Sequence, residues 1–251
     1  MNNLCCPQCG LSHIKRNGYT HYGKQNYRCK GCDRQFVEDS QHIGEDLRDL
    51  IKVLRLERLS LRAICRVTGV SLTWLLDFIA RLYAELPEDL NVSLSQPDKS
   101  IIQLLQLAAE ADEIWSFVTS NENKRWAWIA IDVNTKQVIA FYVGDRSTSS
   151  PRELWWRIPQ VYRDRATFYT DGLTAYKAVI PPERHQVCAK SSGHTNIIER
   201  FNCTLRQRVA RLVRDSLSFS KTLRNHIGAI KYFICHYNRD VIGLGESALH
   251  L

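Results

Sequence analysis

The sequence has no long uncharged apolar stretch and no recognisable leader. No run reaches the roughly 18 apolar residues that a membrane-spanning helix needs, so we expect no such helix. The N-terminal segment MNNLCCPQCG contains no basic residues followed by an apolar run, which argues against a secretory signal. A chain that stays in the cytoplasm keeps its thiols reduced, so disulfide bonds are not expected either.

Acidic residues are the minority among the charged ones. The 251 residues include 34 Lys plus Arg against 26 Asp plus Glu, which gives a formal net charge of +8 at pH 7. This excess favours a polyanionic partner, either nucleic acid or an anionic membrane surface, although many ordinary proteins are also basic. A hydrophobic content of 44% with 10% aromatics indicates a folded globular protein, long enough for two or three small domains.

Cysteines are unevenly distributed, and five of the nine crowd into the first 32 residues. Two Cys-x-x-Cys pairs stand there, Cys6 with Cys9 and Cys29 with Cys32. Two tight turns that each hold two sulfurs can bring four thiolates around a tetrahedral zinc, and the ion would supply the folding free energy of so small a module. We therefore predict a structural Zn²⁺ site. A redox dithiol and a chance pairing are the alternatives, and Cys5 in place of Cys6 is a poorer choice of ligand.

Helical periodicity extends from Gly44 to Leu90 and is interrupted by a turn. In SLRAICRVTGVSLTWLLDFIARL, Ser60 is placed to cap a first short helix, Gly69 breaks it, and Ser71 caps a second. Two short helices joined by a glycine-containing turn are typical of a helix-turn-helix DNA-binding motif, and also of ordinary helical hairpins. The predicted DNA contacts of this motif are Arg62, Arg66, Ser71, Thr73 and Trp74.

The second half of the chain alternates between strand and helix patterns. The expected order begins with three strands, at 110–118, 126–133 and 137–143. A helix from Ser150-Pro151, a further strand at 166–170 and a long helix from near Asn196 follow. This order is the one expected of a ribonuclease-H-like α/β domain. Such a sheet can bring together acidic residues that lie far apart in the sequence.

Three acidic residues occupy prominent positions in these elements. Asp112 lies midway in the first predicted strand, Asp171 ends the fourth, and Glu199 lies one turn into the last predicted helix. Converging carboxylates repel one another unless divalent cations neutralise them. The trio therefore implies two Mg²⁺ or Mn²⁺ ions, of the kind that clamp the attacking and leaving oxygens of a phosphodiester.

Simpler explanations exist for each acid. Asp171 followed by glycine makes a good turn, Glu199 can complete an N-cap box with Asn196, and two neighbouring glutamates, Glu110 and Glu113, compete as the acid of the first strand. Arginines beside the predicted acids favour a phosphate track over a merely solvated helix face. The arginines of this track are Arg200, Arg206, Arg208 and Arg211.

These motifs together resemble the transposase family of insertion sequence 1, over nearly the whole chain. The strings that carry the resemblance are CPQC…RNG…GKQNYRCKGC, RAICRVTGVS, EADEIWSFV, FYTDG and IERFNCTLRQRVARLVRDSLSFSK. The resemblance implies that Asp112, Asp171 and Glu199 are the family's DDE metal ligands. It also implies that the zinc finger and the helix-turn-helix recognise the terminal inverted repeats of the element. The tail NRDVIGLGESALHL has no counterpart in it.

We accordingly expect a DNA transposase with four parts. These are a zinc-binding module at 1–40, a helix-turn-helix domain at 41–90, a linker at 91–104 and a ribonuclease-H-like catalytic domain at 105–251. His194 precedes the last predicted helix and is placed to contact the scissile phosphate, although a lone histidine is more often structural.

The expected reaction has two steps and needs DNA as its partner. Water cuts the phosphodiester at the ends of the element, and the freed 3′-hydroxyl attacks double-stranded target DNA by direct transesterification. Cutting two ends together calls for a homodimer or larger assembly, at the nucleoid in the bacterial cytoplasm. The alternatives are a non-catalytic repressor of the element and a structure-selective nuclease of the same fold, although a nuclease that chooses DNA by shape needs no sequence-reading module.

Overall fold

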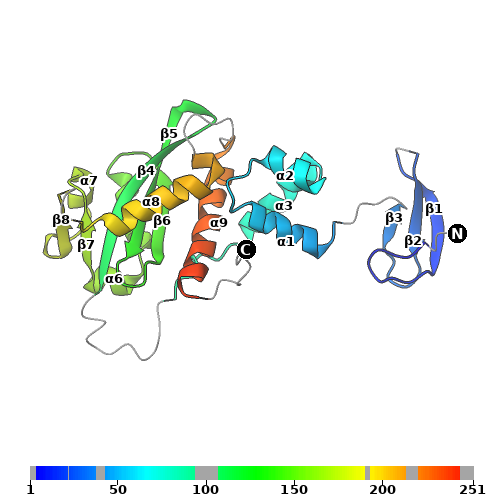
Figure 1. The fold of residues 1–251 in the computed structure, drawn as a ribbon, viewed down its shortest axis with the longest axis horizontal. Coiled ribbons are helices and arrows are strands. Elements are labelled where there is room, and N and C mark those ends of the chain that lie inside the picture. The colour runs from blue at the N-terminus through cyan, green and yellow to red at the C-terminus, as the bar shows by residue number, and fades with distance from the viewer. Residues whose placement is uncertain are drawn as a thin grey trace. The chain divides into compact units, whose positions relative to one another are not determined.

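The computed structural model describes residues 4–21, 23–37, 43–93, 107–189, 193–212 and 220–243. The chain divides into two compact units, residues 1–50 and 51–251, and each is described by itself (Figure 1). Most of the predicted linker at 91–104 and the end of the C-terminal tail lie outside the described residues.

A small three-stranded antiparallel sheet forms the N-terminal unit. Its strands are β1 (Ile14–Tyr19), β2 (Gln25–Cys29) and β3 (Gln35–Val37), in the order β1-β2-β3. Its buried cluster consists of Cys6, Cys29 and Phe36, which is too little apolar surface to stabilise a fold on its own. The cysteines of this unit are therefore the candidates for stabilising it, through the metal site described below.

Three helices follow: α1 (Glu45–Leu54), α2 (Leu61–Thr68) and α3 (Leu72–Ala84). The Ser60 hydroxyl accepts a hydrogen bond from the Ala63 amide and begins α2, and Gly69 ends it in the left-handed conformation with φ 74°. Ser71 begins α3 in the same way as Ser60 begins α2. The two helices meet at 115°, within the range of helix-turn-helix motifs.

Within the described part of the chain, no single helix is long and apolar enough to cross a membrane. The α2–α3 pair passes that test only when its two bent halves are taken together.

A five-stranded mixed sheet in the order β6-β5-β4-β7-β8 forms the core of the larger unit. The strands β4, β5 and β6 are antiparallel neighbours, whereas β7 and β8 run parallel to β4. This is the topology of a ribonuclease-H-like domain, as predicted. The bounds are β4 (Ala108–Val118), β5 (Ser120–Asp132), β6 (Val138–Gly144), β7 (Thr167–Thr170) and β8 (His185–Val187).

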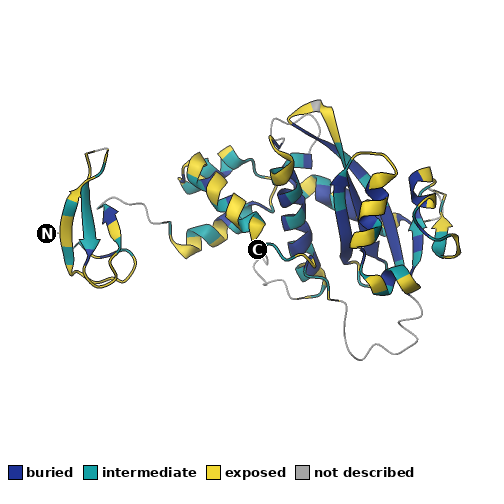
Figure 2. Cartoon of the chain, turned by 180° about the vertical axis from the view of Figure 1, so that it is seen from behind, coloured by how far each residue is buried: buried dark blue, intermediate teal, exposed yellow. Residues whose placement is uncertain are grey.

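Helices cover both faces of this sheet (Figure 1). One face packs against α8 (Asn196–Arg208) and α9 (Leu223–Val241), and the other against α5 (Ser149–Arg157), α6 (Gln160–Arg165) and α7 (Thr174–Lys177). Two short 3₁₀ turns, η1 (Pro182–Arg184) and η3 (Ala210–Leu212), complete the unit. In Figure 2 the sheet strands are mostly buried, and the surrounding helices carry exposed residues on their outer sides.

The helices α2 and α3 belong to the same compact unit as the sheet, because α3 packs on α9. A Cβ atom at Gly228 in α9 would overlap the ring of Tyr83 in α3, so only glycine allows the two helices to lie this close. The hydroxyl of Tyr232 in α9 also donates to the backbone oxygen of Lys52, at 2.9 Å. The predicted helix-turn-helix is thus fixed to the sheet domain by direct packing.

Two sequence expectations need correction. The helix expected to begin with Ser150 as its cap begins at Ser149, after Thr148, and the Ser150 hydroxyl instead donates to Asp145 at 2.9 Å. The segment between the predicted strand at 166–170 and the helix from near Asn196, for which no strand was predicted, contains β8, which pairs with β7 through register partners such as Phe168 and His185. Three residues are too few for a periodic pattern, so this strand gives no sequence signal.

Candidate active site

Asp112 and Asp171 meet where β7 stops beside β4. The parallel register pairs Ala111 with Thr170, the last residue of β7, so the next residue of each chain segment is one of these aspartates. Beyond this point β4 continues to Val118 without β7 beside it. The end of the shorter strand therefore brings the two aspartates side by side, with one oxygen of each within 4.8 Å of the other.

The position of Asp171 is fixed by the turn that follows. Its Oδ1 atom accepts a hydrogen bond from the Leu173 amide at 3.0 Å, which is an Asx turn of the kind that the Asp-Gly sequence predicts. The turn explanation and the site explanation are therefore compatible, because the turn holds the carboxylate at the end of the strand.

Glu199 lies in the first turn of α8, the helix that covers this side of the sheet. Its Oε1 atom accepts a hydrogen bond from the Thr195 hydroxyl at 2.9 Å, not from Asn196 as the N-cap box predicted. Its carboxylate is close enough to raise the pKa values of both Asp112 and Glu110. Glu199 is exposed at the surface, so its carboxylate is accessible from solvent.

Glu110 has a structural contact within the sheet domain. It is buried, and its Oε2 atom accepts the amide hydrogen of Ile198 at 2.7 Å. A carboxylate at the amino end of a helix satisfies a free amide and complements the helix dipole. Burial raises its pKa despite this bond, and we assign Glu110 to anchoring α8 on β4.

Asn202, one turn after Glu199, holds Asp112. Its Nδ2 atom donates to Asp112 Oδ2 at 2.8 Å, while its own Oδ1 atom is buried with no hydrogen-bond partner among the described residues. Asn202 is not among the site residues predicted from the sequence. The signal was its spacing of three residues from the acid.

Glu113 faces the opposite side of β4 from Asp112, because successive strand residues alternate. It nevertheless joins the group: one oxygen each of Asp112, Glu113 and Asp171 lie within 4.8 Å of one another. Glu113 pairs with Arg146 at 3.0 Å. Among the described residues, these three form the acidic group with metal-ligand spacing, and Glu199 lies outside it.

The electrostatics of this group favour a bound cation. Burial, followed by the charges of Asp112 and Asp171, raises the pKa of Glu113 to about 7 against the lowering effect of Arg146. Burial and then the charge of Asp171 likewise raise the pKa of Asp112. A divalent cation would relieve both the mutual repulsion and the desolvation, so the donor set fits one.

The four predicted zinc ligands of the N-terminal unit lie together. The Cys6 and Cys32 sulfurs are 3.5 Å apart, as are those of Cys9 and Cys29, and all four fall within 4.8 Å of one another. Sulfurs at 2.3 Å from a tetrahedral zinc would be separated by about 3.8 Å. The cluster therefore fits a structural zinc, and Cys5 is not one of its four sulfurs.

The predicted contacts of the helix-turn-helix lie on α2 and at the start of α3. Arg62 and Arg66 are exposed on α2, and Thr73 is exposed in the first turn of α3. Ser71 is exposed but uses its hydroxyl to cap α3, and Trp74 is half-buried and stacks on Phe78 at 5.0 Å.

The arginines of the predicted phosphate track differ in their surroundings. Arg200 is exposed on α8, and Arg206 is half-buried. Arg208 donates to the Leu56 backbone oxygen at 2.8 Å and pairs with Glu57, which ties α8 to the turn after α1. Arg211 donates to the Ser220 hydroxyl at 3.2 Å, and burial lowers its pKa.

His194 stacks on Tyr169 of β7, with ring centroids 5.3 Å apart. It therefore lies at the same end of the sheet as the acidic group.

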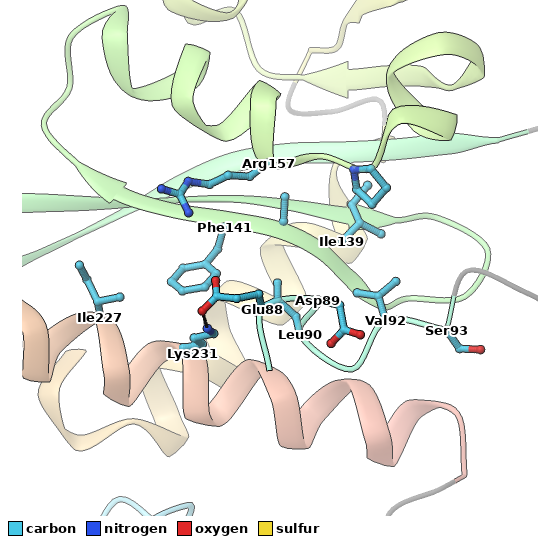
Figure 3. Close-up of a pocket in the computed structure, with 12 residues that line it drawn as sticks. Glu88, Asp89, Leu90, Val92, Ser93, Ile139, Phe141, Arg157, Ile227 and Lys231 are labelled. Atoms are coloured by element: carbon cyan, nitrogen blue, oxygen red, sulfur yellow. Dashed lines mark hydrogen bonds and ion pairs between the residues drawn. The ribbon is translucent and has the colours of Figure 1, made fainter. Parts of the chain in front are cut away.

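A separate pocket of about 780 Å³ lies on the outer edge of the sheet (Figure 3). Ile139 and Phe141 of β6, Ile227 of α9 and the segment 88–93 line it. Lys231 pairs with Glu88 at its rim, at 2.6 Å. None of the candidate acids lines this pocket, so it does not belong to the site.

Comparison with known proteins gives a consistent result for the sheet domain. The family described as IS1 transposase matches residues 105–238. The insertion element IS1 4 and IS1 2 proteins InsB of Escherichia coli (strain K12) are each 34% identical over 144 residues, covering 57% of this chain and 81% of each relative. A cryo-EM structure of the simian T-cell lymphotropic virus intasome with PP2A regulatory subunit B56 gamma aligns over 71% of this chain and 66% of that chain. Its TM-score of 0.37 at 13% identity is too low to carry an argument.

Proposed function

Because this chain belongs to the IS1 transposase family, we propose that it binds the terminal inverted repeats of an insertion element, cuts the element's ends and joins the freed 3′-hydroxyls to target DNA. The observation that carries the proposal is the meeting of Asp112 and Asp171 at the end of β7, with Glu199 on the helix that covers them. The family is that of a DDE transposase, and the proposed chemistry is metal-dependent strand cleavage followed by strand transfer.

The three acids have distinct proposed roles. Asp112 and Asp171 are held by Asn202 and by the Leu173 turn, so they provide fixed oxygens for Mg²⁺ or Mn²⁺. Exposed Glu199 completes the ligand set on the DNA side. Two such ions would stabilise the attacking and leaving oxygens of the phosphodiester. In the first step water attacks phosphorus, and the bond from phosphorus to the 3′-oxygen breaks. In the second step the freed 3′-hydroxyl attacks a phosphorus of the target strand and loses its proton, the bond from that phosphorus to the target's own 3′-oxygen breaks, and the displaced oxygen leaves as a 3′-hydroxyl.

The remaining parts supply DNA binding. Four cysteines would hold a structural Zn²⁺, and the exposed side chains of α2 and α3 would contact DNA bases and phosphates. Arg200 and Arg206 would follow the phosphate backbone. We leave Arg208 and Arg211 out of this interface, because both make contacts within the chain. Two ends must be joined in one event, so we propose a homodimer or larger assembly on DNA.

Strand cleavage and joining by the purified chain tests this function. The substrate is labelled DNA that carries the element's own ends, with Mg²⁺, and Asp171→Ala is compared with the wild type. Asp164→Ala, which removes an exposed carboxylate from α6, is the matched control. We expect joined products from the wild type and the control alone. Binding without cleavage by the wild type would favour a repressor instead, and cleavage without joining would favour a nuclease.

A further inference from the structure

Glu113 has a buried carboxylate oxygen that no donor satisfies. Its side chain is 6% exposed, and Oε1 pairs with Arg146, but Oε2 is buried with no hydrogen-bond partner within the described residues. The fully buried Tyr176 is a neighbour of this carboxylate: burial and then the charge of Glu113 raise the pKa of Tyr176, yet neither its hydroxyl nor Glu113 Oε2 has a partner with good hydrogen-bond geometry among the described residues. A buried anionic oxygen without a donor is costly, so this position calls for a positive charge.

The unsatisfied oxygen belongs to a group with the spacing of a metal site. Oxygens of Glu113, Asp112 and Asp171 lie within 4.8 Å of one another. A second unsatisfied buried acceptor, Oδ1, belongs to Asn202, the residue whose amide nitrogen donates to Asp112. Oxygen donors of this kind, from carboxylates and amides, are those that Mg²⁺ and Mn²⁺ prefer.

Glu199 is engaged differently in the same structure. It is exposed, accepts the Thr195 hydroxyl at 2.9 Å and lies outside the group of three. The two glutamates therefore differ in their surroundings: Glu113 has a buried side chain and belongs to the group, whereas Glu199 is exposed and lies outside it.

We propose that Glu113 is a ligand of the first divalent cation in the DNA-free chain, together with Asp112 and Asp171, and that Glu199 is not needed for this binding step. This inference rests on the proposed metal-dependent function and adds a residue to its site. It assigns the two glutamates to different stages: Glu113 holds the cation before DNA is bound, and Glu199 is required once the phosphodiester is in place.

Cation binding by the DNA-free full-length chain tests the assignment without relying on activity. Mn²⁺ is titrated into wild type, Asp171→Asn, Glu113→Gln and Glu199→Gln, and free Mn²⁺ is followed by electron paramagnetic resonance. Asp171→Asn and Glu113→Gln each remove a charged ligand, so we expect each to weaken the affinity for Mn²⁺ about 10-fold or more. Glu199→Gln should bind within about twofold of wild type yet lose strand cleavage. Tyr176→Phe is the matched control, since it removes a buried polar atom beside Glu113 and keeps every carboxylate.

Each contrary result has a definite meaning. Wild-type affinity in Glu113→Gln, with weakened binding in Asp171→Asn, overturns the role of Glu113 and leaves the proposed function standing. Unchanged binding in Asp171→Asn overturns the metal site and with it the proposed chemistry. Equal weakening in Glu199→Gln and Glu113→Gln overturns the separation into stages. If Glu113→Gln does not fold, Glu113→Asp keeps the charge and shortens the reach, and unaltered affinity in that variant also overturns the assignment.

Discussion

Asn202 in α8 donates a hydrogen bond to Asp112 in β4, with 2.8 Å between Nδ2 and Oδ2. The contact joins residues that are 90 positions apart in the chain. A hydrogen bond to a charged acceptor contributes about 1.5–3 kcal/mol, more than a neutral one. It therefore restricts the carboxylate on which the proposed cation chemistry depends.

The first prediction is that Asn202→Ala slows strand cleavage. An Asp112 carboxylate that is free to rotate loses part of its fixed geometry, and we expect a decrease of about 10-fold in the single-turnover rate. Thr204→Ala on the same helix is the control, since the Thr204 hydroxyl contacts only the backbone oxygen of Arg200 among the interactions described here. Equal rates for Asn202→Ala and wild type would remove the positioning role.

The second prediction concerns the N-terminal unit and its metal. Cys29→Ser should abolish binding of about one zinc per chain, measured by elemental analysis, because the site needs four thiolates. Since the larger unit has its own core, its thermal unfolding should remain within error of wild type. Cys5→Ser should retain the zinc, as Cys5 lies outside the cluster. Zinc loss in Cys5→Ser would contradict the ligand set.

The third prediction follows from buried His226. Its Nε2 atom lies 2.9 Å from the Ser116 hydroxyl, and burial, with the charges of Arg211 and Arg125, lowers its pKa to about 4. Unfolding returns the pKa to about 6.5, so the unfolded chain binds the proton more readily between these values. Stability from this residue is therefore present above pH 6.5 and is lost as the pH falls.

The size of this effect can be measured by difference. The free energy of unfolding of wild type should fall by about 2 kcal/mol more than that of His226→Gln between pH 7 and pH 5. Denaturant unfolding of both proteins at each pH gives the value, and the remaining titrating groups cancel in the comparison. Parallel pH profiles for the two proteins would show that His226 is not buried in its neutral form.

The fourth prediction separates arginines that bind DNA from those that hold the fold. Arg62→Ala and Arg66→Ala should each weaken binding and reduce the slope of log K against log salt by about 1. Arg208→Ala should instead leave that slope unchanged and lower stability by about 1 kcal/mol, because Arg208 contacts Leu56 and Glu57. A reduced salt slope in Arg208→Ala would return this residue to the DNA interface.

Elements with a strong local pattern could be predicted from the sequence. The serine caps at Ser60 and Ser71, the break at Gly69 and the strands around Asp112 all have signals within a few neighbouring residues. The four clustered cysteines were predicted for the same reason, since two fixed spacings define them.

Features that depend on contacts between distant segments could not be predicted. Nothing local distinguishes Glu110, which anchors α8, from Glu113, which joins the aspartates, because the difference lies in which neighbour each faces. Asn238 in α9 is a similar case: it is fully buried and bonds the Val138 amide and the Leu90 oxygen, although its sequence surroundings are ordinary. Charge alone also gave no means of separating Arg208 from Arg200.

The close approach of α9 to α3 at Gly228 has a consequence for the DNA rather than for the protein. If α2 and α3 cannot move relative to the carboxylates of Asp112 and Asp171, the chain sets the number of base pairs between the DNA sequence that it is proposed to recognise and the phosphodiester bond that it is proposed to cut. B-form DNA turns once in about 10.5 base pairs, so inserting about five would carry the bond to the far side of the duplex. Inserting a full turn of DNA would return the bond to the original side of the duplex, but the bond would then lie one helical turn farther from the carboxylates.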